Sequence, residues 1–137
     1  MEQPNRMDAS AMNASNKRGR RGQLLGGGKT PKKKILFVCT YAKARSATAE
    51  EMFNGVGGIE AKSAGTAKDY PNCVTKELMD WAEVILVMEE IHRQYLIEVD
   101  GSSAHKILVL DIPDLFGRNQ PELIQLLHEK AQPILKY

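Results

Sequence analysis

The sequence predicts an α/β fold: a small four-stranded parallel sheet with helices on both faces. Three short apolar runs, at residues 35–38, 84–88 and 107–110, are continuous rather than alternating, as in strands that are covered on both faces. Segments whose apolar residues recur at helical spacing fill the intervals between these runs. Such an alternation of strand and helix is typical of a parallel sheet.

In the first half of the domain, the strand at residues 35–38 is followed by a helix. The apolar face of that helix holds Ala49, Met52 and Phe53. Residues 59–63 form a weaker strand candidate, and their mixed polarity favours a position at the edge of the sheet.

In the second half, two helices flank the strand at residues 84–88. Their expected buried faces are Val74, Leu78, Trp81 and Ala82 before that strand, and Ile91, Tyr95 and Val99 after it. Asn119, followed by Pro121 and Glu122, is a start signal for the last helix. Its expected buried stripe is Leu123, Leu127, Ala131 and Ile134. Pro133 is expected to fray or end this helix.

Charge is divided unevenly along the 137-residue chain, whose formal net charge is +2. Residues 1–34 carry nine Lys or Arg against two acids, whereas residues 35–137 carry ten against fifteen. The N-terminal part also has too few apolar residues to offset the entropy of ordering its backbone. We therefore expect a disordered basic arm at residues 1–33 and an α/β domain at residues 34–137.

The basic arm suggests partners but does not identify one. Its clusters at residues 17–21 and 32–34 could bind nucleic acid, an anionic lipid or an import receptor, although a solvated tail is the simpler interpretation. No segment approaches the ~20 apolar residues of a transmembrane helix. The N-terminus also lacks the apolar stretch of a secretory signal. The expected location is the cytoplasm; nuclear or organelle targeting through the arm stays open, and the oligomeric state is undetermined.

The loop after the first strand is the candidate site, because ligands of parallel α/β sheets bind beyond the carboxyl ends of the strands. Cys39 ends that strand, and the following loop leads into a helix whose N–H groups attract anions. These surroundings favour the thiolate form of Cys39, while Arg45 can hold two phosphate oxygens. The Ser46 hydroxyl can donate to the sulfur. The alternative interpretation is a buried structural Cys beside an ordinary helix-start Arg.

Four segments, in order, resemble the low-molecular-weight protein tyrosine phosphatases. They are ILFVCTYAKARSATAE at residues 35–50, SAGT at 63–66, DWAEVILVME at 80–89 and IPDLFG at 112–117. The resemblance covers about residues 35–137, is closest to a shorter branch of the family, and does not extend to the arm.

The resemblance implies a metal-independent phosphatase that needs no cofactor and acts on a phosphotyrosine protein or a small aryl phosphate. Cys39 would form a phosphocysteine, Arg45 would hold the phosphoryl oxygens, and Asp114 would be the general acid. The implied phosphate-binding loop is Thr40, Tyr41, Ala42, Lys43, Ala44, Arg45 and Ser46. The implied substrate wall is Tyr41, Tyr70 and Phe116.

Asp111 competes with Asp114 for the role of general acid. Asp114 is favoured because it occupies the catalytic slot when IPDLFG is aligned with the acid segment of the family. Leu115 stands where the family usually has proline, which weakens that alignment. In the alternative assignment, Asp111 is the general acid.

Two alanines in the loop depart from the family pattern. Ala42 stands where the family commonly has Asn; in a left-handed conformation, alanine costs on the order of 1 kcal/mol and provides no bracing amide. Ala44 stands where many members have a second loop cysteine, so Cys39 lacks a nearby partner for a protective disulfide and is expected to be more exposed to irreversible oxidation unless Cys73 approaches it. Ala42 leaves open a catalytically weak phosphate-binding module. A thiol-dependent arsenate reductase, which would share the fold and the loop, is a further alternative, and only Cys73 remains as another thiol for it.

A few other polar residues lie near the expected site. Glu89 and Glu90 follow the third strand, so one carboxylate could touch the rim of the site, although a solvated first helical turn is the simpler interpretation. His92, His105 and His128 are interpreted as surface or capping histidines rather than ligands.

Overall fold

The computed structural model describes residues 33–136 and contains one four-stranded sheet. Its strands are β1 (Lys33–Cys39), β2 (Ile59–Gly65), β3 (Val84–Val87) and β4 (Ile107–Val109). All neighbouring strands pair in parallel, in the order β2-β1-β3-β4. The predicted sheet is therefore confirmed, with β2 at an edge as expected. The predicted arm at residues 1–33 lies outside the described residues, except for Lys33, which begins β1.

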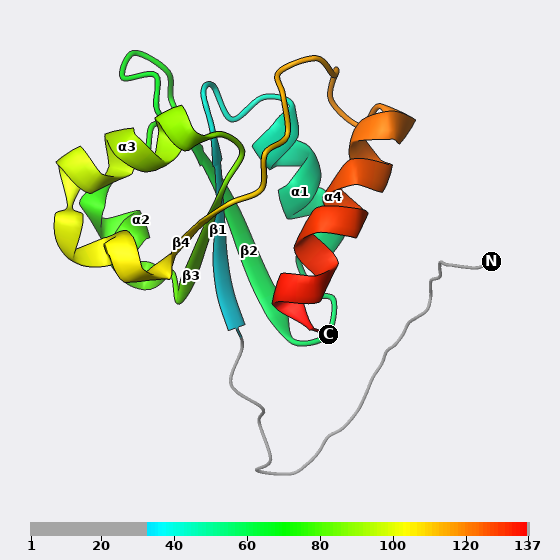
Figure 1. Ribbon diagram of the computed structural model, residues 1–137, viewed down its shortest axis with the longest axis horizontal. Coiled ribbons are helices and arrows are strands. Elements are labelled where there is room, and N and C mark those ends of the chain that lie inside the picture. Colours follow the sequence, from blue (N-terminus) through cyan, green and yellow to red (C-terminus); the bar gives the residue numbers. More distant parts are fainter. Residues whose placement is uncertain (1–32, 137) are drawn as a thin grey trace, which may run out of the picture. The chain divides into compact units, whose positions relative to one another are not determined.

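Helices cover both faces of the sheet, as predicted. They are α1 (Arg45–Phe53), α2 (Lys76–Trp81), α3 (Glu90–Val99) and α4 (Pro121–Leu135), with a short 3₁₀ helix, η1 (Gly101–Lys106), before β4. Figure 1 shows α1 and α4 on one side of the sheet and α2 and α3 on the other. No helix within residues 33–136 combines the length and the apolar composition of a membrane span.

Strand β1 is an inner strand of a sheet covered on both faces, which explains why its sequence is continuously apolar. Ile35, Phe37 and Cys39 belong to the core shared with α1 and α4, whereas Leu36 and Val38 belong to the core shared with α2 and α3. All five side chains are buried, because successive residues of a strand point to opposite faces and both faces are covered here. The same alternation places the Cys39 side chain on the α1 side.

The predicted buried face of α3 is wrong by a rotation of the helix. Ile91 and Val99, both expected inside, are 68% and 39% exposed, and Tyr95 is half-buried. The inward residues are instead His92 and Leu96, which are 1% and 0% exposed. A pattern built on apolar residues alone cannot identify a histidine that is buried because it has polar partners.

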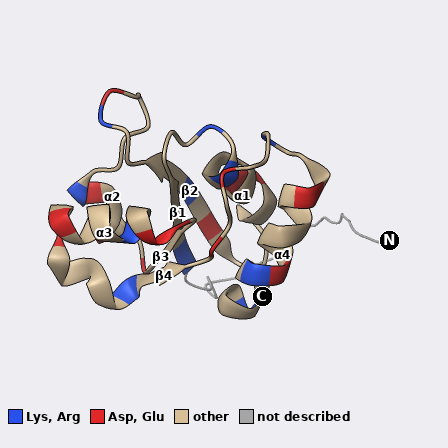
Figure 2. Ribbon diagram, turned by 45° about the horizontal axis from the view of Figure 1, so that its top comes forward, with Lys and Arg blue, Asp and Glu red and all other residues tan. Residues whose placement is uncertain are grey.

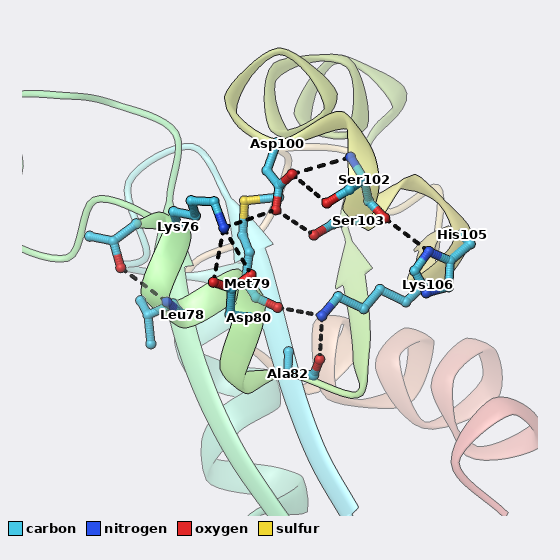
Figure 3. A network of polar contacts seen from close by, with 11 residues as sticks. Lys76, Leu78, Met79, Asp80, Ala82, Asp100, Ser102, Ser103, His105 and Lys106 are labelled. Atoms are coloured by element: carbon cyan, nitrogen blue, oxygen red, sulfur yellow. Dashed lines mark hydrogen bonds and ion pairs between the residues drawn. The ribbon is translucent and has the colours of Figure 1, made fainter.

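Helix α2 is shorter than its apolar pattern suggested. Of the four residues expected on its buried face, Val74 and Ala82 are buried but flank the helix, and the buried residue within it is Met79. The ammonium group of Lys106 donates to the carbonyls of Met79 (2.6 Å) and Ala82 (2.7 Å) and so caps the end of α2, as Figure 3 shows.

The same close view shows how η1 begins after α3. The Asp100 carboxylate accepts hydrogen bonds from the Ser102 N–H (3.2 Å), the Ser102 hydroxyl (2.6 Å) and the Ser103 hydroxyl (3.1 Å) (Figure 3). Lys76 of α2 lies 3.8 Å from the same carboxylate. The Asp100 carboxylate thus caps the start of η1, and Lys76 links it to α2 through a partly exposed ion pair.

Helix α4 follows its predicted stripe except at the last position. Leu123, Leu127 and Ala131 are buried as expected, but the fourth buried residue is Leu135. The cap is Gln120 rather than Asn119, with Pro121 at the first helical position. The helix also continues for two residues past Pro133. The cost of Pro133 falls on the preceding turn, because its ring nitrogen has no hydrogen to donate to the carbonyl four residues earlier.

Candidate active site

The loops after β1 and β2 lie against each other at the carboxyl end of the sheet (Figure 1). Thr66 N–H donates to the carbonyl of Cys39 (3.0 Å), and Ala67 N–H donates to that of Thr40 (2.9 Å). Gly65 permits this contact, because a Cβ atom there would lie 2.5 Å from the Thr40 carbonyl oxygen. The glycine of the SAGT segment thus allows the end of β2 to pack directly against the backbone of the candidate phosphate loop.

The Cys39 sulfur lies at the centre of the loop and is surrounded by hydrogen-bond donors. Cys39 is 3% exposed, and Ala42 N–H donates to its sulfur at 3.2 Å. The Ser46 hydroxyl lies 3.1 Å from the same sulfur, at the position that the sequence predicted for a donor. A thiolate accepts hydrogen bonds from both groups, which is the environment that a sulfur nucleophile needs.

Helix α1 begins at this loop without a capping side chain. Its N-cap is Ala44, which offers no oxygen to the first turn. The N–H groups of that turn have no acceptor within the helix, so they carry the partial positive charge of the helix end. A bound oxyanion can accept from them.

Ala42 adopts the left-handed conformation anticipated for this position, with φ of 60°. This conformation directs the Ala42 N–H to the Cys39 sulfur, at the steric cost that the Cβ atom of a non-glycine residue bears in the left-handed region. Ala44, two residues later, has an ordinary φ of −118°.

We expect Ala42→Gly to raise the free energy of unfolding by about 0.5–1 kcal/mol, because glycine adopts positive φ without the steric cost that alanine bears. Ala67→Gly is the matched control, since Ala67 lies outside the helices and strands and has no positive φ, so a glycine there should not stabilise the protein. Urea unfolding of the two variants measures the difference. Equal stability changes at both positions would show that the Ala42 conformation carries no cost.

Arg45 is a buried guanidinium with fixed partners. It is 2% exposed, and its Nη1 donates to the carbonyl of Ile112 (2.8 Å) and to the carboxylate of Glu89. Its Nε lies 3.8 Å from the Asp114 carboxylate. These contacts hold the guanidinium plane in place from the side of Nη1, as a clamp for phosphoryl oxygens requires.

The structure brings most of the predicted loop residues around one cavity of about 60 Å³. The lining residues are Cys39, Thr40, Tyr41, Lys43, Ala44, Arg45 and Asp114. The two remaining members of the predicted loop, Ala42 and Ser46, are buried and contact the sulfur instead. One small cavity thus contains the candidate nucleophile, clamp and acid.

The two candidate acids lie in different places. Asp114 lines the cavity of Cys39, with its side chain 66% exposed, and Figure 2 shows an acidic position of the β4–α4 loop beside the basic start of α1. Asp111 has φ of 58° and lines a neighbouring cavity with Glu89, Glu90, Ile91 and Pro113. The geometry therefore favours Asp114 over Asp111 for proton transfer at the Cys39 cavity.

Two of the three predicted wall residues, Tyr41 and Tyr70, form an aromatic pair, of which Tyr41 lines the cavity. The rings of Tyr41 and Tyr70 are 4.6 Å apart and tilted by 60°. The Lys43 ammonium lies 5.0 Å from the centre of the Tyr70 ring, a cation–π contact. Phe116 is half-buried and packs against the core shared by α1 and α4, outside the set of residues that line the cavity.

Two polar residues at the start of α3 contribute more than the sequence indicated. Glu89 holds Arg45, while Glu90 remains exposed. His92 is buried; its Nδ1 accepts from Glu89 N–H (3.0 Å), and its Nε2 lies 3.0 Å from the Thr40 hydroxyl. Only their position after the end of β3 pointed to the site, because the rotation of α3 decides which residues face it.

Burial lowers the pKa of His92 to about 4, and the positive charge of Arg45 is the second cause. The negative charges of Glu89 and Asp114 act in the opposite direction. Between pH 6.5 and 4 the unfolded chain therefore binds a proton that the folded protein does not. The contribution of His92 to the free energy of unfolding is therefore fully present above pH 6.5 and decreases by up to about 3 kcal/mol on acidification to pH 4. Urea titrations should show this slope in the wild type and a smaller one in His92→Asn; identical slopes would contradict the assignment.

Cys73 is too far from Cys39 to protect it by a disulfide. Both are free cysteines, and Cys73 pairs with Gly65, which in turn pairs with Cys39 in the sheet. Two neighbouring strand-to-strand distances therefore separate the Cα atoms of Cys39 and Cys73. They amount to ~10 Å, whereas a disulfide bridges Cα atoms up to ~7 Å apart. Within residues 33–136, no group of three or more His, Cys, Asp or Glu side chains is placed to hold a metal ion.

The comparisons with known proteins point to one family. The family described as low molecular weight phosphotyrosine protein phosphatase matches residues 34–79. The chain is 26% identical to a protein-arginine-phosphatase of Bacillus subtilis (strain 168), over 74% of this chain and 97% of that protein.

Solved structures share the fold. A YwlE arginine phosphatase mutant with a phosphorylated active-site serine is 25% identical, with a TM-score of 0.61 over 75% of this chain and 96% of the other. Wzb of Vibrio vulnificus, in complex with benzylphosphonate, is 24% identical, with a TM-score of 0.64 over 77% and 98% of the two chains.

Proposed function

We propose that the chain is a cysteine-dependent phosphatase of the low-molecular-weight protein tyrosine phosphatase family, and that it hydrolyses aryl phosphates, phosphotyrosine among them, through a phosphocysteine intermediate. The observation that carries the proposal is the single cavity lined by Cys39, Arg45 and Asp114. Nucleophile, oxyanion clamp and acid are the three groups that the reaction requires.

In the first step, the Cys39 thiolate attacks phosphorus along the line of the departing ester oxygen. The S–P bond forms, the P–O ester bond breaks, and Asp114 gives its proton to the leaving phenolate oxygen. The loop N–H groups and Arg45 stabilise the charge on the three equatorial oxygens. Arg45 is suited to this because Glu89 and the Ile112 carbonyl already fix its orientation.

In the second step, the Asp114 carboxylate takes a proton from water, whose oxygen attacks phosphorus. The S–P bond breaks, the Cys39 thiolate returns, and inorganic phosphate leaves. Ala42 N–H and the Ser46 hydroxyl, both within 3.2 Å of the sulfur, stabilise it as the leaving group.

The mouth of the cavity supports an aryl substrate. Tyr41 and Tyr70 offer a tilted pair of rings against which a phenyl ring can pack. Both are partly exposed, at 46% and 37%, so a phosphotyrosine side chain can reach them. Phe116 keeps a structural role in this proposal, since its contacts are with the core.

Phosphoarginine is the second candidate substrate, because a protein-arginine-phosphatase is among the relatives of the chain. The electrostatics of the mouth disfavour it. Lys43 lines the cavity and its ammonium group is held over Tyr70, so a guanidinium attached to the phosphate would meet a like charge.

The test is turnover of phenyl phosphate, a phosphotyrosine peptide and a phosphoarginine peptide under the same conditions, with vanadate as inhibitor. We expect vanadate-sensitive hydrolysis of both aryl phosphates and a lower kcat/KM for phosphoarginine. A preference for phosphoarginine would replace the proposed substrate. Binding of inorganic phosphate without turnover of any of the three would instead indicate a phosphate-binding module.

A further inference from the structure

The phosphate loop lacks an internal polar brace at Ala42 and is held from outside by the first turn of α3. Glu89, the N-cap of that helix, binds Arg45 at the end of the loop. His92, one turn into the helix, contacts Thr40 at the start of the loop. The two ends of the loop are therefore attached to the same turn.

The hydrogen bonds of His92 determine its tautomer. A backbone N–H can only donate, so His92 Nδ1 must accept from Glu89 N–H. The proton of a neutral imidazole then lies on Nε2, which donates to the Thr40 hydroxyl oxygen 3.0 Å away. This direction leaves the Thr40 hydroxyl hydrogen to point elsewhere, and Thr40 lines the cavity of Cys39.

We propose that His92 is a positioning residue of the phosphate loop: by donating to Thr40 it fixes the start of the loop and turns the Thr40 hydroxyl hydrogen toward a bound oxyanion. The proposal rests on the phosphatase function proposed above. Burial supports it, since His92 is 1% exposed and both ring nitrogens have partners. The contact also spans 52 residues of sequence, so it stabilises tertiary rather than local structure.

The competing explanation is that His92 only caps α3, and two substitutions of His92 and one of Thr40 separate the roles. His92→Asn keeps a short side-chain acceptor for Glu89 N–H but cannot reach Thr40. His92→Gln carries an amide N–H out to about the position of the imidazole Nε2 and can restore the donation to Thr40. Thr40→Val removes the hydroxyl and keeps the shape of the side chain.

The experiment measures the dissociation constant of inorganic phosphate and the kcat/KM for phenyl phosphate in these three variants and in His92→Asn/Thr40→Val. We expect His92→Asn and Thr40→Val each to weaken phosphate binding roughly five- to tenfold, as the loss of one hydrogen bond does. The double variant should be no worse than either single variant, because both remove the same interaction. His92→Gln should recover most of the binding.

Two results would overturn the proposal. One is additivity, in which the double variant loses the product of the two single effects. The other is unchanged phosphate affinity in His92→Asn, which keeps the acceptor for Glu89 N–H and loses only the contact with Thr40; capping of α3 would then be the sole role of His92. Wild-type turnover is measured first, so its absence counts against the proposed function, whereas the phosphate constants judge the role of His92 separately.

Discussion

Cys39→Ser is expected to lower turnover of phenyl phosphate on the order of 10⁴-fold or more, because a serine hydroxyl at this position has no general base to activate it. The cavity should survive the change. Ala42 N–H and the Ser46 hydroxyl can both donate to a serine oxygen in place of the sulfur. Arg45 also keeps its contacts with Glu89 and Ile112. The variant should therefore still bind inorganic phosphate.

Cys73→Ser is the matched control for this prediction. Cys73 is separated from Cys39 by Gly65, and its thiol contacts only the neighbouring Val74 carbonyl, at 3.6 Å, among the described hydrogen bonds. Its removal should leave turnover nearly unchanged. Equal turnover in Cys39→Ser and the wild type would rule out a cysteine nucleophile. Reduction of arsenate with added thiols that depends on Cys73 would favour the thiol-dependent arsenate reductase.

Asp114→Asn is expected to have the next largest effect, and its size should depend on the leaving group. Phenolate needs a proton as it departs, so hydrolysis of phenyl phosphate should slow about 10²- to 10³-fold. A nitrophenolate departs without full protonation, so p-nitrophenyl phosphate should be affected much less in the first step. The measurement is kcat/KM across aryl phosphates of graded leaving-group pKa, which reports the first step alone.

Asp111→Asn tests the rival acid under the same assay. Asparagine tolerates the left-handed backbone at this position, where φ is 58°, so the fold should be retained. We expect little change in the dependence on leaving group. A steep dependence in wild type that persists unchanged in Asp114→Asn and changes in Asp111→Asn would assign the proton transfer to Asp111.

The fold was predictable because its central strand is covered on both faces. The continuous apolar run at 35–38 can be explained only if neighbouring side chains are buried against two different layers, as Phe37 and Val38 are. The edge position of β2 followed from its mixed polarity for the same reason. These are local signals, and tertiary packing did not override them.

The rotation of α3 was not predictable from its apolar residues. Ile91 and Val99 fit an amphipathic pattern, yet the helix buries His92 and Leu96. The imidazole can be buried because it has a donor in the Glu89 N–H, at the start of the helix, and an acceptor in the Thr40 hydroxyl of the loop. Hydrogen-bond partners that are far apart in the sequence, such as Thr40 and His92, leave no periodic signal.

The candidate site shows the same division between local and tertiary signals. The strand-to-helix loop already places Cys39, Ser46 and Arg45 near one another, so the sequence could indicate them as a group. Glu89 enters only because β3 pairs with β1 and therefore ends beside the loop. Its position directly after a buried strand was the available clue.

The central claim, a covalent intermediate on Cys39, is tested most directly by trapping it. The Asp114→Asn variant is mixed with excess p-nitrophenyl phosphate and quenched in acid within the first turnover, and the peptide that contains Cys39 is then examined by mass spectrometry. This variant suits the purpose because it lacks the carboxylate that activates water, so the intermediate should accumulate. We predict one phosphoryl group on Cys39 and a burst of nitrophenolate equal to the enzyme concentration. Continued turnover with no burst and an unmodified Cys39 would contradict the mechanism.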